Sequence, residues 1–156
     1  MKNKGFSLVE LIIVIAIMAI LAAAIAPALI RYIDKSRRGD DVQAAATINT
    51  AVTAVLANED AYDAVAKSMD GSTVIASANA HSAGATFAGA ATFTADLNSN
   101  LGGEAPQVKY VKNFQSNYTG THVWQVKVNT AGKPVVILNT SSNDYELQPT
   151  IDACYK

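Results

Sequence analysis

The residues best suited to bind a metal are acidic side chains near the C-terminus. Asn143, Asp144, Glu146 and Asp152 place four oxygen-bearing side chains within a short stretch, and Ca²⁺ prefers oxygen ligands. A polar loop between two strands would have the same composition, and we favour that simpler interpretation. Asp144, Glu146 and Asp152 therefore stand as weak calcium candidates, and the sequence indicates no other metal or cofactor.

The two histidines and the single cysteine do not form a catalytic set. His81 and His122 are isolated in the sequence, without Cys, Asp or Glu at ligand spacing, so a zinc site is not expected. Cys154 is the only cysteine, which excludes an internal disulfide. It either packs as a small hydrophobe, which we favour, or joins two chains.

Neither a Gly-rich phosphate loop nor a G-x-S-x-G motif is present. With a net charge of −1, we expect neither an enzyme nor a specific nucleic-acid site.

Glu10 is the chemically unusual residue, because it stands at the front of an apolar segment. No residue from Leu11 to Ile30 is charged. About 20 residues at a rise of ~1.5 Å span roughly 30 Å, the thickness of a hydrocarbon core. An ionised carboxylate inside such a segment is energetically costly.

Two interpretations of this segment leave Glu10 unexplained. A secretory signal peptide would be cleaved near its Ala-rich stretch, but the apolar run exceeds the usual ~7–15 residues. A simple membrane anchor fits the length and gives the carboxylate no role. The flanking charges do not fix an orientation either, since basic residues lie on both sides: Lys2, Lys4, Arg31, Lys35, Arg37 and Arg38.

A third interpretation gives Glu10 a function. If the chain is cut between Gly5 and Phe6, Phe6 carries a new α-amino group near the start of the same helix. Glu10 gains there from the helix dipole and from free backbone N–H groups. When such helices bundle, Glu10 of one chain can neutralise the Phe6 amine of its neighbour. Because an unpaired charge in an apolar core is costly, this pairing would fix the axial register of assembly.

The segment Lys4-Gly5-Phe6-Ser7-Leu8-Val9-Glu10, with its apolar run and Pro27, resembles the N-terminal signature of type IV pilins and related pseudopilins. The resemblance covers residues 4–27 and implies that prepilin peptidase removes residues 1–5 after Gly5. The same enzyme would methylate Phe6. The resemblance also implies a homopolymeric helical filament, a pilus assembly machinery, and membrane insertion before assembly.

Two features depart from the family pattern. Ala19 stands where glycine is common, and alanine is the better helix former by ~1 kcal/mol. Many relatives also have a C-terminal disulfide loop, which a single cysteine cannot form. Pro27 is expected to kink the helix without ending it.

The elements that position these residues begin with one long helix from Phe6 to about Asn58. Residues 6–30 form its transmembrane or filament-core part, and residues 31–58 continue it as an amphipathic helix. The charged stretch Arg31–Asp41 is expected to be a solvated interfacial belt. A helical stripe then predicts the face that packs on a sheet: Ala45, Ile48, Val52, Val55 and Leu56.

The remainder predicts a globular head. Residues 59–106 are expected to hold a short helix capped by Asn58, a second short helix ending at Gly102-Gly103, and a variable surface loop. Residues 107–156 predict an antiparallel sheet with strands at 107–112, 122–128, 135–139 and 145–147. The fold class is therefore α+β, with a sheet packed on the end of a long helix.

The expected function is that of a major pilin in a pilus serving adhesion, twitching motility or DNA uptake. A pseudopilin of a type II secretion or competence system and a minor tip pilin acting as a binding module remain as alternatives. The subunit is expected in the cytoplasmic membrane before assembly and in an extracellular filament afterwards.

Overall fold

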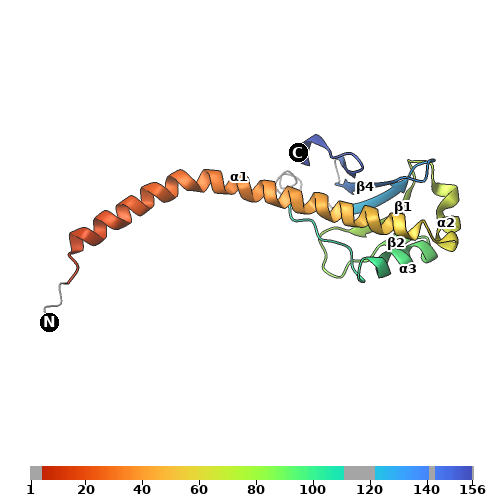
Figure 1. The fold of residues 1–156 in the computed structure, drawn as a ribbon, viewed down its shortest axis with the longest axis horizontal. Helices are drawn as coiled ribbons and strands as arrows, with labels where there is room; N and C mark the ends of the chain where they lie inside the picture. The colour runs from red at the N-terminus through yellow and green to blue at the C-terminus, as the bar shows by residue number, and fades with distance from the viewer. Residues whose placement is uncertain (1–4, 111–121, 141–142, 156) are drawn as a thin grey trace. The chain divides into compact units, whose positions relative to one another are not determined.

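The computed structural model describes residues 5–110, 122–140 and 143–155. The chain divides into two compact units, Met1–Ser36 and Arg37–Lys156. We call them the N-terminal unit and the head. Helix α1, Leu8–Val55, contributes to both (Figure 1).

Helix α1 continues through Pro27, so the proline does not end it, as expected. The helix begins two residues after the predicted Phe6, because Phe6 and Ser7 precede the first turn, and it ends three residues before the predicted Asn58. The buried residues of α1 all lie in its second half, and they are Asp41, Ala45, Ile48, Ala51, Val52 and Val55. The predicted sheet-facing stripe is therefore confirmed, apart from Leu56, which follows the helix and is half-buried.

The head contains a five-stranded antiparallel sheet in the order β2-β1-β3-β4-β5. Its strands are β1 Val74–Asn79, β2 Ala88–Gly89, β3 Val123–Val128, β4 Pro134–Asn139 and β5 Asp144–Gln148. The expected strands at 122–128, 135–139 and 145–147 are confirmed as β3, β4 and β5. The α+β class is confirmed with them.

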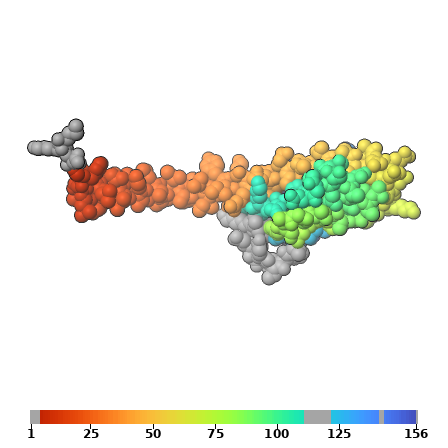
Figure 2. Space-filling model, turned by 90° about the horizontal axis from the view of Figure 1, so that it is seen from below, coloured from red at the N-terminus to blue at the C-terminus, as the bar shows by residue number. Residues whose placement is uncertain are grey.

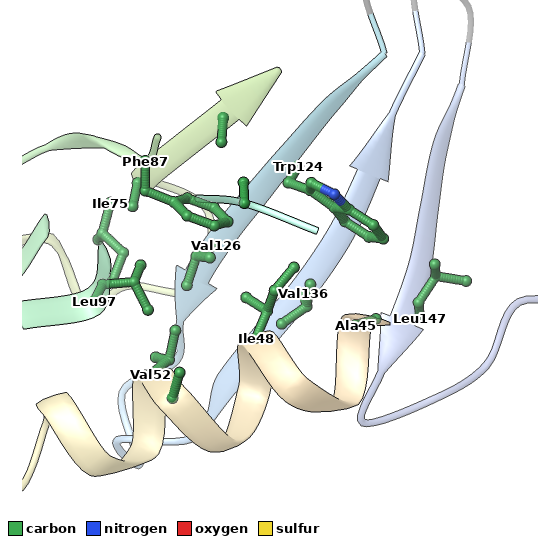
Figure 3. Packing of buried hydrophobic residues seen from close by; sticks show 14 of the residues in the cluster. Ala45, Ile48, Val52, Ile75, Phe87, Leu97, Trp124, Val126, Val136 and Leu147 are labelled. Atoms are coloured by element: carbon green, nitrogen blue, oxygen red, sulfur yellow. The ribbon is translucent and has the colours of Figure 1, made fainter. Parts of the chain in front are cut away.

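The core lies between the sheet and the second half of α1 (Figure 3). Ile48 and Val52 point from α1 toward Val126 and Val136 of the sheet. Burial alternates along β3, as a strand with one covered face requires. Trp124 is fully buried, and its indole Nε1 donates to the carbonyl of Pro106 at 2.7 Å. The largest core side chain is thus also satisfied at its polar atom.

The short helices follow the predicted signals. Asn58 caps α2, Glu59–Val65, by accepting from the Asp60 N–H at 3.2 Å, and a 3₁₀ turn, η1, continues over Ala66–Ser68. Helix α3, Ala91–Asn100, is closed by Gly102 at φ 81° and Gly103 at φ 98°. The Gly103 N–H donates to the Asn98 carbonyl at 2.8 Å. Positive φ suits glycine, so the predicted stop is confirmed.

The surface loop predicted within residues 69–106 is wrong in part, because this segment supplies β1 and β2. Ile75, Ala76 and Ala78 are buried in the core. Its Ala, Ser, Asn and Gly content gives little intrinsic preference for strand, and pairing with β3 overrides that composition. A glycine at position 89 is required, since a Cβ there would lie 2.2 Å from the Ile75 carbonyl oxygen.

The strand predicted at 107–112 is also wrong for the residues described. Residues 107–110 form no strand. The backbone N–H groups of Lys109 and Tyr110 instead donate to the Asp41 carboxylate, at 2.7 and 3.0 Å. Backbone N–H donors that bond a side chain of α1 are not available to pair with a neighbouring β-strand. Residues 111 and 112 lie outside the described residues.

Both outer strands of the sheet are partly covered by local structure. Beside β5, the Asp152 N–H donates to the Glu146 carbonyl at 2.8 Å, and the Thr150 N–H donates to the Glu146 side chain at 3.3 Å. Beside β2, which has only two residues, the Asn98 side chain bonds both backbone groups of Phe87, at 2.8 and 2.9 Å.

Candidate functional site

The predicted cleavage junction lies in extended chain just before α1. Gly5, Phe6 and Ser7 are non-helical and exposed, and α1 begins at Leu8. The Phe6 side chain is 88% exposed, and no atom lies within 4 Å of a Cβ built on Gly5. The Gly5–Phe6 bond is therefore accessible and outside regular hydrogen bonding.

Ser7 and Glu10 together form a capping box at the start of α1. The Ser7 Oγ accepts from the Val9 N–H at 3.3 Å, while the Glu10 Oε2 accepts from the Ser7 N–H at 2.8 Å. The two residues therefore satisfy free donors of the first turn. The contact of Glu10 with a free backbone N–H was expected, but the reciprocal cap by Ser7 was not, although the pattern Ser-x-x-Glu before an apolar run is its usual signal.

The first half of α1 carries apolar side chains that nothing within its unit buries. Between Leu8 and Ile33 the large hydrophobic residues are 41–73% exposed. In Figure 2 the side chains of this stretch, drawn red to orange, form the surface. By length and composition this helix can cross a membrane. A soluble protein rarely leaves so large an apolar surface uncovered, which indicates contact with lipid or other chains.

A second carboxylate on α1, Asp41, has the opposite environment, since it is fully buried. Burial raises its pKa to about 6, and the two backbone N–H donors from Lys109 and Tyr110 oppose that shift. Nearby, the Arg38 Nη1 donates to the Cys154 carbonyl at 3.1 Å, and its guanidinium lies 5.3 Å from the centre of the Tyr110 ring. Arg38 and Asp41 therefore attach two later segments of the head to α1.

The two histidines, expected to be isolated, are in contact. His81 Nε2 and His122 Nδ1 are 2.8 Å apart, and the rings meet edge to face. Burial lowers the pKa of both imidazoles, and for His122 the charge of His81 adds to the effect. The pair joins residues 41 positions apart at the ends of β1 and β3, so no local spacing could have revealed it.

The calcium candidates near the C-terminus serve local structure. Asp144 accepts from the Asn139 side chain, and the Asp152 carboxylate accepts from the Cys154 N–H at 2.9 Å. Across residues 5–110, 122–140 and 143–155, no group of three or more His, Cys, Asp or Glu side chains is placed to hold a metal ion.

Cys154 is half-buried, and burial raises its thiol pKa to about 12, so it is a poor nucleophile.

Comparison with known protein families identifies a motif at the N-terminus. Residues 1–26 match the family model described as the prokaryotic N-terminal methylation motif. No solved structure matches the chain. The motif is typical of prepilin peptidase substrates and supports membrane anchoring through the apolar helix. The chain therefore carries a type IV pilin-like methylation motif at the head of a long apolar helix, within a pilin-like α+β architecture.

Proposed function

We propose that the chain is a major pilin, the repeated structural subunit of a type IV pilus serving adhesion, twitching motility or DNA uptake. Prepilin peptidase removes residues 1–5 by cutting between Gly5 and Phe6, and methylates Phe6. The subunit waits in the cytoplasmic membrane and then polymerises into an extracellular filament through the assembly machinery. It acts as a structural protein and not as an enzyme.

The observation that carries this proposal is the methylation motif on a helix whose apolar side chains are uncovered. Before assembly, lipid covers the apolar half of α1. In a filament, the same side chains pack against the equivalent helices of other subunits. One segment thus serves two environments, both of which exclude water.

Glu10 sets the register of this packing in the proposed filament. In the single chain, the capping box uses its Oε2. The other carboxylate oxygen can accept from the methylated Phe6 amine of a neighbouring subunit. Placing both charges in an apolar helix bundle is tolerated only when they pair, so subunits slipped along the axis are disfavoured.

The first experiment is the intact mass of the protein in fibres sheared from cells. Abundant fibres whose subunit lacks residues 1–5 and carries one added methyl group are the expected result. A processed mass found only in the membrane fraction would instead indicate a pseudopilin. A mature chain beginning beyond Ala26 would exclude the proposal.

The role of Glu10 is tested with variants that separate capping from charge. Glu10→Gln keeps an acceptor suited to the capping box and removes the charge. Ser7→Ala keeps the charge and weakens the cap by about 1 kcal/mol. We expect Glu10→Gln to be processed normally while fibre yield falls at least about tenfold, since an unpaired buried charge is costly. Ser7→Ala should still form fibres. Equal losses in both variants would make Glu10 a capping residue only.

A further inference from the structure

Two basic side chains follow the apolar segment on one face of α1. Ala28, Arg31, Tyr32 and Lys35 are spaced by three and four residues, which places them side by side on a helix. They line a shallow groove of about 310 Å³. Arg31, Tyr32 and Lys35 are all exposed, Tyr32 by 73%. All four belong to the N-terminal unit.

The described part of the chain does not neutralise these cations. Among residues 5–110, 122–140 and 143–155, Arg31 and Lys35 make neither an ion pair nor a side-chain hydrogen bond. Three other charged residues along this stretch have partners. Asp40 pairs with Lys109 at 3.1 Å, Arg38 bonds the Cys154 carbonyl, and Asp34 is half-buried and engaged in contacts of its own.

The position of the groove along α1 matches the phosphate layer of a bilayer that the helix would span. If Leu11–Ile30 spans the hydrocarbon core, Arg31 is the first residue beyond it. Lys35 then lies roughly 6 Å further along the axis, at ~1.5 Å per residue. A headgroup layer is about 5–8 Å thick on each side of the core. Both cations therefore fall within that layer, and Tyr32 lies where interfacial aromatic residues are favoured.

The side-chain chemistry favours phosphate with a net negative charge. A guanidinium binds phosphate oxygens through two parallel N–H donors, and the lysine ammonium adds a point charge one helical turn away. The Tyr32 hydroxyl can donate a further hydrogen bond. In a zwitterionic lipid the attached amine opposes this attraction, whereas an anionic phospholipid lacks that opposing charge.

We propose that Arg31, Tyr32 and Lys35 form a binding surface for the headgroup of an anionic phospholipid, in the leaflet on the side of the head. The bound lipid holds the subunit at a fixed depth in the membrane. It must be released when a subunit leaves the bilayer. This inference rests on membrane anchoring and not on filament formation, so it can fail or succeed independently of the proposed function.

The test uses the full chain in nanodiscs that contain phosphatidylcholine and phosphatidylglycerol, with native mass spectrometry to identify the retained lipids. We expect the wild-type chain to retain phosphatidylglycerol at least about fivefold above its share of the bilayer, given two basic residues at the surface. Arg31→Gln/Lys35→Gln should abolish that preference. Lys67→Gln/Lys133→Gln removes two exposed lysines from the head and should leave it unchanged.

Unchanged lipid preference in Arg31→Gln/Lys35→Gln would overturn the proposal. So would an equal loss in the control variant, which would indicate a general charge effect. If the double variant does not insert, the wild-type chain decides the matter: raising the salt from about 0.1 M to about 1 M should remove the preference, because screening shortens from about 10 Å to about 3 Å. Retention that persists at high salt would contradict headgroup binding by these cations. Displacement of the lipid by excess inorganic phosphate would show a free-anion site instead.

Discussion

The two halves of helix α1 differ in how side-chain size relates to burial: the larger apolar side chains are in the half that is not buried. The first half is built of Leu, Ile, Val and Met that stay exposed within their unit, whereas the second half buries mainly Ala and Val. Large aliphatic residues give the greatest gain when another molecule covers them. Small residues let a sheet approach the helix closely. Burial within the single chain is therefore a poor guide to where the strongest hydrophobic driving force of this chain lies.

Two of the carboxylates of α1 repeat the contrast. Glu10 is exposed in the single chain and accepts one backbone N–H, while Asp41 is fully buried and accepts two. Glu10 still has capacity to bind a partner outside the chain. Asp41 has already used its capacity to attach residues 109 and 110 to the helix. Glu10 thus has the free capacity that its proposed assembly role requires, whereas Asp41 acts within the fold.

A matched pair of substitutions gives the largest expected difference between the halves. Ile48→Ala removes a fully buried side chain, and we expect the head to lose about 2–5 kcal/mol of unfolding free energy. Ile17→Ala changes a residue that is 53% exposed, so head stability should not change measurably. Urea denaturation of both variants, followed by Trp124 fluorescence, measures the difference. Comparable losses would mean that the first half also supports the head.

The buried carboxylate gives the next largest effect, as a dependence of stability on pH. The folded pKa of Asp41 is raised to about 6, so the folded head binds an extra proton between about pH 4 and pH 6. Its stabilising contribution is present at low pH and is lost as pH rises through about 6, by about 2–3 kcal/mol in total. We expect the difference between wild type and Asp41→Asn to follow this curve in denaturation from pH ~4 to ~7. A constant difference would show that Asp41 does not titrate in this range.

The histidine pair should make the stability of the head depend on pH in the opposite direction to Asp41, and more weakly. Burial lowers the pKa of His81 and His122, so the unfolded chain takes up protons first as pH falls below about 6.5. Their contribution is present at neutral pH and is lost on acidification. His122→Gln should therefore flatten the fall in stability below pH ~6.5, measured against an Asp41→Asn background to remove the other titration. An unchanged slope would exclude the pair as an acid-sensitive contact.

Removing the first half of α1 should have the smallest effect of all. A fragment of residues 36–156 retains every buried residue of α1, and Ser36 can cap the shortened helix. We expect a soluble, folded monomer whose unfolding free energy matches that of the full chain in detergent within about 0.5 kcal/mol. Circular dichroism and sedimentation check the fold and the mass. Aggregation or disorder of the fragment would contradict an independent head.

Much of the fold could be predicted because the relevant patterns are local. The helical stripe from Ala45 to Val55, the Asn58 cap and the Gly102-Gly103 stop each depend on spacing within a few residues. The Ser7–Glu10 capping box is local as well, and its Ser-x-x-Glu pattern is readable in the sequence. Strand β1 could not be predicted from its composition, since its Ala- and Ser-rich sequence becomes a strand only beside β3.

The remaining errors come from contacts between distant residues. Asp41 takes the backbone donors of Lys109 and Tyr110 across 68 and 69 positions, which removes the expected strand there. His81 and His122 meet only because β1 and β3 are neighbours. A single sequence contains these residues but not their pairing, because pairing follows from the packed topology.

The covered edges of the sheet have a consequence for crowding. In a polymer, many copies of the head are held at very high local concentration for long periods. An open strand edge under those conditions would invite the sheets of neighbouring heads to join and grow as a cross-β aggregate. The C-terminal turn bonded to Glu146 occupies one outer strand, and a two-residue strand beside the Asn98 clamp leaves little template at the other. In the proposed filament, heads can thus be packed densely while little free strand edge is left for a neighbouring sheet to join.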